Sequence, residues 1–93
     1  MDTTFNNIAL NIIKEQALII GPIAWGEAGK IPGLTVDALT KSASISGNPQ
    51  EVIDRLVSRY EQFFGKASHE VCREAVQSIV ADMQPELIPT SLR

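Results

Sequence analysis

The fold of this chain is decided by residues 48–83, NPQEVIDRLVSRYEQFFGKASHEVCREAVQSIVADM, where most of the strong periodic signal lies. Asn48 can cap a helix through its side-chain oxygen, Pro49 suits the first helical position, and Glu51 completes a capping-box spacing. Apolar residues then recur in steps of three and four, which predicts a helix with one apolar face over 49–64. These residues are Ile53, Leu56, Val57, Tyr60, Phe63 and Phe64.

Gly65 interrupts this pattern. A glycine in the left-handed conformation commonly ends a helix, and Ser68 could then cap the next one. The apolar phase nevertheless continues across the glycine, so one kinked helix over 48–83 is also open. We expect two helices that meet at Gly65, the second over 67–83. Pro85 and Pro89 then mark a short extended tail.

The first helix is expected over residues 4–20, and it is amphipathic only as far as Gln16. Residues 17–25, ALIIGPIAW, carry no charge on any side. A helix that is apolar all round must be covered, either by running through the middle of the fold or by meeting another subunit. Pro22 lacks a backbone donor, so the helix should stop there and a second one should cover 22–29.

A loop at 29–33 precedes a further expected helix over 35–45. Thr35 can cap it, and Leu34 and Leu39 have the spacing of a hydrophobic staple. No sustained alternation typical of strands appears. The sequence therefore predicts an all-α fold, a single-domain helical bundle of four to five helices over 1–93, with 1–3 and 85–93 as tails.

Composition restricts the partners. The chain has 93 residues, with 8 Lys and Arg against 11 Asp and Glu, and the basic residues form no cluster, so we expect no nucleic acid. The single Cys fits a reducing compartment. Nothing at the N-terminus resembles a signal peptide, and the longest uncharged apolar run, 17–26, is too short to cross a bilayer. A cytoplasmic protein with no membrane partner is the expectation.

Catalytic chemistry finds little support. His69 and Cys72 are three residues apart on a helix and could meet, but no third group orients them. Cys72 also falls on the apolar face, where a free cysteine is usually a small buried hydrophobe. A structural zinc site needs about four ligands, and the chain has one His and one Cys. We expect no enzyme, no metal and no cofactor.

Residues 20–24, IGPIA, within IIGPIAW and followed by acidic Glu27, resemble the small GPIA-containing helical module of bacterial, notably cyanobacterial, signalling proteins. The matching residues are Gly21, Pro22, Ile23 and Ala24, and the resemblance covers roughly a quarter of the chain. The second half, with YEQFFGKASHEVCREA, departs from that pattern. The resemblance implies a helical accessory or interaction module with no catalytic residues.

We expect this chain to be a non-enzymatic protein-interaction or oligomerisation module with a regulatory or signalling-associated role. It would contact its partner through apolar side chains. A homodimer or a complex with another protein would follow. The candidate interaction residues are Leu18, Ile19, Ile20, Pro22, Ile23, Trp25, Glu27, Phe63 and Phe64. The alternative is a small-ligand or sensor domain whose apolar pocket is lined by Trp25, Tyr60, Phe63 and Phe64. Glu27 could anchor a partner or line a pocket, or equally lie at a helix end in water or pair with Lys30.

A faint internal echo accompanies these candidates, because residues 19–21 (IIG) resemble 63–65 (FFG). Glycines permit close backbone approach, so the two helix breaks either pack against each other or are unrelated.

Overall fold

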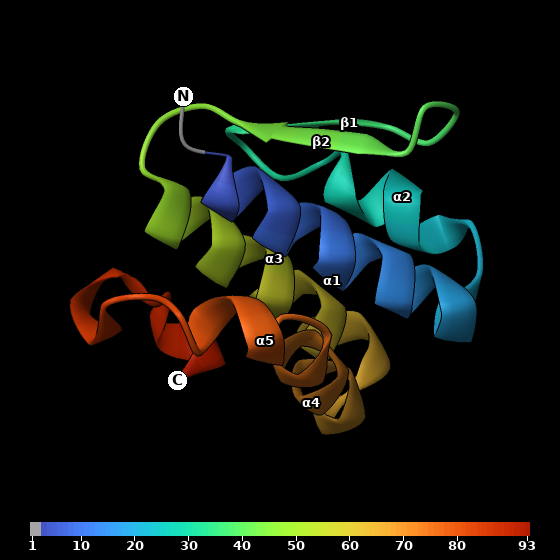
Figure 1. Ribbon diagram of the computed structural model, residues 1–93. Coiled ribbons are helices and arrows are strands. Elements are labelled where there is room, and N and C mark those ends of the chain that lie inside the picture. Colours follow the sequence, from blue (N-terminus) through green and yellow to red (C-terminus); the bar gives the residue numbers. More distant parts are fainter. Residues whose placement is uncertain (1–2) are drawn as a thin grey trace.

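A computed structural model describes residues 3–93; Met1 and Asp2, part of the predicted N-terminal tail, lie outside the described residues. The described chain is a small, compact and mostly helical domain that also contains a two-stranded sheet. Its elements are α1 (Thr4–Ile20), α2 (Ile23–Ala28), β1 (Leu34–Asp37), β2 (Ser42–Ile45), α3 (Pro49–Phe64), α4 (Lys66–Ala75), α5 (Gln77–Val80), and 3-10 turns at Pro85–Leu87 and Thr90–Leu92. In Figure 1, α1 crosses the middle of the molecule, with the β1–β2 hairpin on one side and α4 on the other.

The structure confirms α3 and its start signal. The side-chain oxygen of Asn48 accepts the backbone N–H of Glu51 at 3.2 Å, and Pro49 is the first helical residue. The helix ends at Phe64, because Gly65 adopts a φ of 89° and donates its N–H to the Glu61 carbonyl. Two helices therefore meet at Gly65, as expected. Ser68 is not a cap, since it lies buried inside α4.

Gly21 ends α1 in the same way as Gly65 ends α3. Its φ is 80°, and its N–H bonds the Ala17 carbonyl at 3.0 Å. Both glycines combine a positive φ with a ψ near 180°, a region that side-chain-bearing residues essentially avoid. The sequences IIG and FFG thus end their helices with a glycine in the same backbone conformation. The predicted break at Pro22 is confirmed, with α2 following directly.

The predicted helix over 35–45 is wrong, and so the fold is not all-α. Antiparallel strands β1 and β2 occupy this stretch, with Leu34 paired to Ile45 and Val36 to Ala43. These four side chains are buried or half-buried, whereas their neighbours Thr35, Asp37, Ser42 and Ser44 are exposed. The alternation is only four residues long in each strand, which is why a sequence search for sustained alternation missed it.

Two local features favour this hairpin over a helix. Asp37 accepts the backbone N–H groups of Leu39 and Thr40 through Oδ1, a side-chain turn that competes with helix formation. On the second strand, the backbone N–H of Ile45 donates to Asn6 Oδ1 at 2.9 Å, which attaches the sheet to α1. Leu39, expected to form a staple with Leu34, instead lies at the turn and is 95% exposed.

The C-terminal region also differs from expectation. The helix predicted over 67–83 is broken at Val76, which separates α4 from α5. The segment after Pro85 is not an extended tail, because it forms the two 3-10 turns and docks against α3. Asp54 Oδ1 accepts both the backbone N–H and the hydroxyl of Ser91, at 3.0 and 2.6 Å. Leu92 is buried in the core as a result.

One apolar core joins these elements, and α1 and α3 supply its centre. Ile8, Ile12 and Ile13 from α1 meet Ile53, Leu56 and Val57 from α3, all with no exposed surface. Smaller contributions come from α2, the hairpin, α4 and the last 3-10 turn. Burying a large aliphatic side chain is worth about 1.5–3 kcal/mol, so this central layer dominates the stability of the domain.

Candidate functional site

The junction between α1 and α2 exposes large apolar side chains. Leu18 is 79% exposed, Ile19 63% and Ile23 52%, and Pro22 between them is exposed as well. The uncharged stretch from 17 to 25 therefore does not run through the middle of the fold. Its first half leaves the core at Gln16 and reaches the surface, while Ala24 and Trp25 turn back inward.

Two contacts connect α2 to the C-terminal half of α3, which also carries Phe63. Arg59 donates to Glu27 Oε1 at 3.2 Å, and the Tyr60 hydroxyl donates to the Ala24 carbonyl at 2.6 Å. Residues 30–32, after α2, lie beside 54–58. The two segments thus run antiparallel. Phe63, one turn after Tyr60, is 54% exposed.

We define the apolar corner as Ile19, Ile23 and Phe63. All three are among the nine candidate interaction residues, and each is more than half exposed. Leu18 and Pro22 are their neighbours in sequence and line a pocket together with Ala38 and Lys41 of the hairpin. Ile20 and Phe64 are half-buried and pack against the core, so we do not include them in the exposed corner.

Glu27 is held inside the fold by two cations. It is only 7% exposed, its Oε2 lies 2.9 Å from Lys30 Nζ, and its Oε1 lies 3.2 Å from Arg59. The hydrogen bond from Lys30, helped by the charge of Arg59, lowers the pKa of the Glu27 carboxyl. The guanidinium of Arg59 also lies 5.0 Å from the centre of the Phe63 ring. Glu27 therefore fixes α2 on α3 and orients the corner through Arg59.

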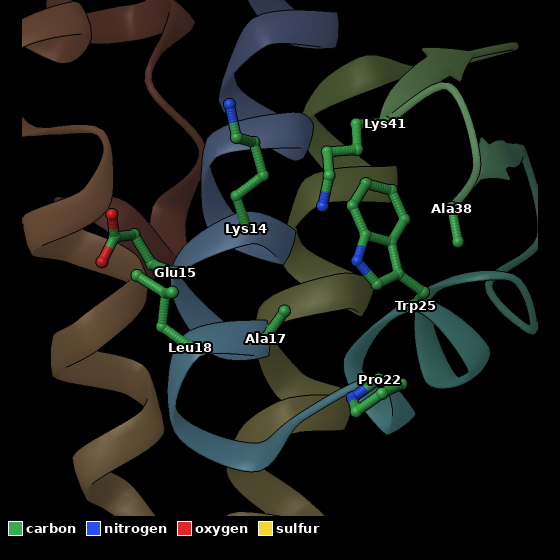
Figure 2. Close-up of a pocket in the computed structure, with 8 residues that line it drawn as sticks. All are labelled: Lys14, Glu15, Ala17, Leu18, Pro22, Trp25, Ala38 and Lys41. Atoms are coloured by element: carbon green, nitrogen blue, oxygen red, sulfur yellow. The ribbon is translucent and has the colours of Figure 1, made fainter.

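The ligand pocket expected from the sequence is not assembled. Tyr60 is fully buried in the core, and burial raises the pKa of its hydroxyl. A pocket of about 480 Å³ does lie beside Trp25, but Tyr60, Phe63 and Phe64 are absent from its wall. Figure 2 shows that this pocket opens between α1, α2 and the turn of the hairpin, with Lys14 and Lys41 on its rim.

His69 and Cys72 take separate structural roles. The imidazole of His69 lies 2.9 Å from Glu61 Oε2 and 2.5 Å from the Ser91 carbonyl, which ties α4 to α3 and to the C-terminal segment. Cys72 has no exposed surface and faces α1 instead. The buried position expected for Cys72 is confirmed, and desolvation raises the pKa of its thiol to about 11.

We expect Cys72 to react slowly with a thiol reagent in the folded protein. Only the thiolate is nucleophilic, and a pKa of about 11 leaves little of it at neutral pH. Labelling by dithionitrobenzoate, followed by its absorbance, should be slow under native conditions and complete quickly in concentrated guanidinium. Rapid labelling of the folded chain would revive a reactive-thiol role for Cys72.

Gln16 is a buried polar residue that the sequence did not single out. Its Nε2 donates to the Ser68 carbonyl at 2.9 Å and contacts Cys72 Sγ at 3.4 Å, while its Oε1 has no hydrogen-bond partner. Both contacts lie on α4, so Gln16 sets the register between α1 and α4. Its position one helical turn after Ile12 and Ile13, on the apolar face, was the available signal.

Among residues 3–93, no group of three or more His, Cys, Asp or Glu side chains could hold a metal ion. No helix within this range is both long enough and apolar enough to cross a lipid bilayer.

The fold and the corner define a small, mostly helical domain with a hairpin and an exposed apolar surface. Comparison of the chain with protein-family models, with curated proteins and with solved structures gave no match. The resemblance to the GPIA-containing module therefore stays a prediction from residues 20–27.

Proposed function

We propose that this chain is a non-enzymatic protein-interaction module that forms a homodimer through the apolar corner. A regulatory or signalling-associated role in the cytoplasm goes with this proposal, on the strength of the GPIA resemblance and the single reduced cysteine. The observation that carries the proposal is the exposure of Ile19, Ile23 and Phe63. Contiguous apolar surface of this kind typically marks an interaction site.

A second copy of the chain is the simplest occupant of the corner. Symmetric pairing buries the same patch on both subunits, and it is the commonest arrangement among homo-oligomers. Arg59 lies beside one member of the corner, because its guanidinium is 5.0 Å from the centre of the Phe63 ring.

We expect Ile19→Lys to convert the dimer into a folded monomer. Each buried isoleucine is worth about 1.5–3 kcal/mol and occurs twice in a symmetric pair, so the dissociation constant should rise by roughly a hundredfold or more. Lysine in the last turn of α1 also suits the negative end of the helix. Light scattering across a dilution series measures the mass, and circular dichroism checks the fold.

Leu39→Lys provides the matched control. It makes the same charge change at a leucine that is 95% exposed on the hairpin turn and is not part of the corner. This variant should keep the mass of the unmodified protein. A wild-type chain that is already monomeric at high micromolar concentration would refute the dimer. Equal loss of mass in both variants would refute the apolar corner as its interface.

The alternative, a small-ligand domain, is supported by one observation. Trp25 lines a pocket of about 480 Å³, a size that suits small molecules, although its other wall residues differ from those expected.

A further inference from the structure

The pocket beside Trp25 combines apolar walls with two lysines. Ala17 and Leu18 from α1 and Pro22 and Trp25 from the α1–α2 region form its apolar side. In Figure 2, the ammonium of Lys41 lies next to the indole ring, and Lys14 stands on the facing helix. The distance from Lys41 Nζ to the centre of the ring is 6.0 Å. One end of the pocket is thus cationic and the remainder is apolar.

Among residues 3–93, the two lysines have no carboxylate partner. Within residues 3–93, the ion pairs of Lys and Arg side chains use Lys30, Arg55, Arg59 and Arg73, and neither Lys14 nor Lys41 takes part. Glu15 also belongs to the pocket rim, but Figure 2 shows its carboxylate directed away from Trp25. The positive charge beside the indole is therefore not neutralised by any carboxylate in the described part of the chain.

Lys41 is held in an unfavourable backbone conformation. It is the one non-glycine residue in the described chain with a positive φ, at 53°. Turns normally place glycine or asparagine at such a position, because their small side chains fit it without strain. The side chain of Lys41 extends from the turn to a position over the Trp25 ring. A strained residue at this position indicates that the Lys41 side chain has a role outside the turn.

We propose that this pocket binds a small amphipathic anion, an apolar body carrying one carboxylate. The body would lie against Trp25, Leu18 and Pro22, and the carboxylate would pair with Lys41 and, at longer range, Lys14. A single negative charge fits best, because only the ammonium of Lys41 lies over the indole ring. This site does not depend on dimer formation through the apolar corner.

Trp25 is the sole tryptophan and therefore reports on the pocket directly. We would titrate the protein with 4-phenylbutyrate and follow Trp25 fluorescence, with 4-phenylbutan-1-ol as the uncharged probe of the same shape. The expected result is a saturable change with the acid and at least tenfold weaker binding of the alcohol. Added salt should weaken the binding of the acid and leave the binding of the alcohol unchanged.

Lys41→Asn separates binding from stability. Asparagine tolerates a positive φ, so this variant should unfold at the same temperature or higher, while binding 4-phenylbutyrate at least tenfold more weakly. Lys14→Gln should give a smaller loss. Lys66→Gln removes an exposed lysine at the start of α4, away from the pocket, and should bind as the unmodified protein does.

The titration is repeated on Ile19→Lys, because pairing of two chains through Ile19 would bring the partner close to Leu18. No saturable fluorescence change in either protein overturns the proposed pocket. Equal affinity for the acid and the alcohol, or an equal loss in Lys66→Gln and Lys41→Asn, overturns it as well. Binding in the Ile19→Lys monomer alone supports the pocket and shows that the dimer covers it.

Discussion

Replacing Leu56 by alanine should lower the free energy of unfolding by about 2–5 kcal/mol. Leu56 lies in the middle of α3 with no exposed surface, within the core layer shared with α1. The substitution removes buried apolar atoms and leaves a cavity that the two long helices can close only in part. The total free energy of unfolding of a small domain is about 5–15 kcal/mol, so this loss is a large fraction of it. Urea unfolding followed by circular dichroism measures the change.

Leu39→Ala is the matched control for Leu56→Ala. The same atoms are removed, but Leu39 is 95% exposed on the hairpin turn, so the change should stay within about 0.5 kcal/mol. Both proteins must be compared at one chain concentration, because association stabilises the folded state. Similar unfolding midpoints for the two variants would contradict the placement of the core between α1 and α3.

Gly33→Ala should be the second strongly destabilising change. Gly33 has a φ of 85°, and an added Cβ would lie 2.7 Å from the Ser46 carbonyl oxygen and 2.9 Å from Val52 Cγ2. The Gly33 carbonyl also accepts the backbone N–H of Ser46 at 2.8 Å, which closes the open end of the hairpin. Left-handed strain of about 1–2 kcal/mol and overpacking of about 1–3 kcal/mol together give a loss of about 2–5 kcal/mol.

Gly47→Ala separates these two causes. Gly47 has nearly the same φ, 90°, but a Cβ there meets no atom within 4 Å. Only the backbone strain applies, so the loss in the free energy of unfolding should be about 1–2 kcal/mol. Both variants can be followed by thermal unfolding. If Gly33→Ala is no worse than Gly47→Ala, then the hairpin does not pack against Val52 as closely as the structure has it.

The sequence predicted the exposed apolar residues only in part. Ile19, Ile23 and Phe63 were all among the candidate interaction residues, because Ile19 and Ile23 lie in an uncharged stretch and Phe63 lies on the apolar face of the helix over 49–64. Exposure separates them from Ile20 and Phe64, which the same pattern could not distinguish. Trp25 lines a pocket, but with other residues than expected, and Lys14 and Lys41 on its rim come from separate elements that the sequence did not connect with Trp25.

Signals confined to a few residues determined α1, α2, α3 and the breaks between them. Asn48 bonds a residue three positions away, and Gly21 and Gly65 each bond a carbonyl four positions earlier, so the sequence by itself contains these interactions. The tertiary structure decided the rest. The hairpin at 34–45 is short and Ser-rich, and it is held by Asn6, 39 residues from Ile45. Glu27 is buried because Arg59 lies across from it, and Gln16 because Ser68 is 52 residues away. Such pairings depend on how whole helices pack, and no local pattern along the chain records them.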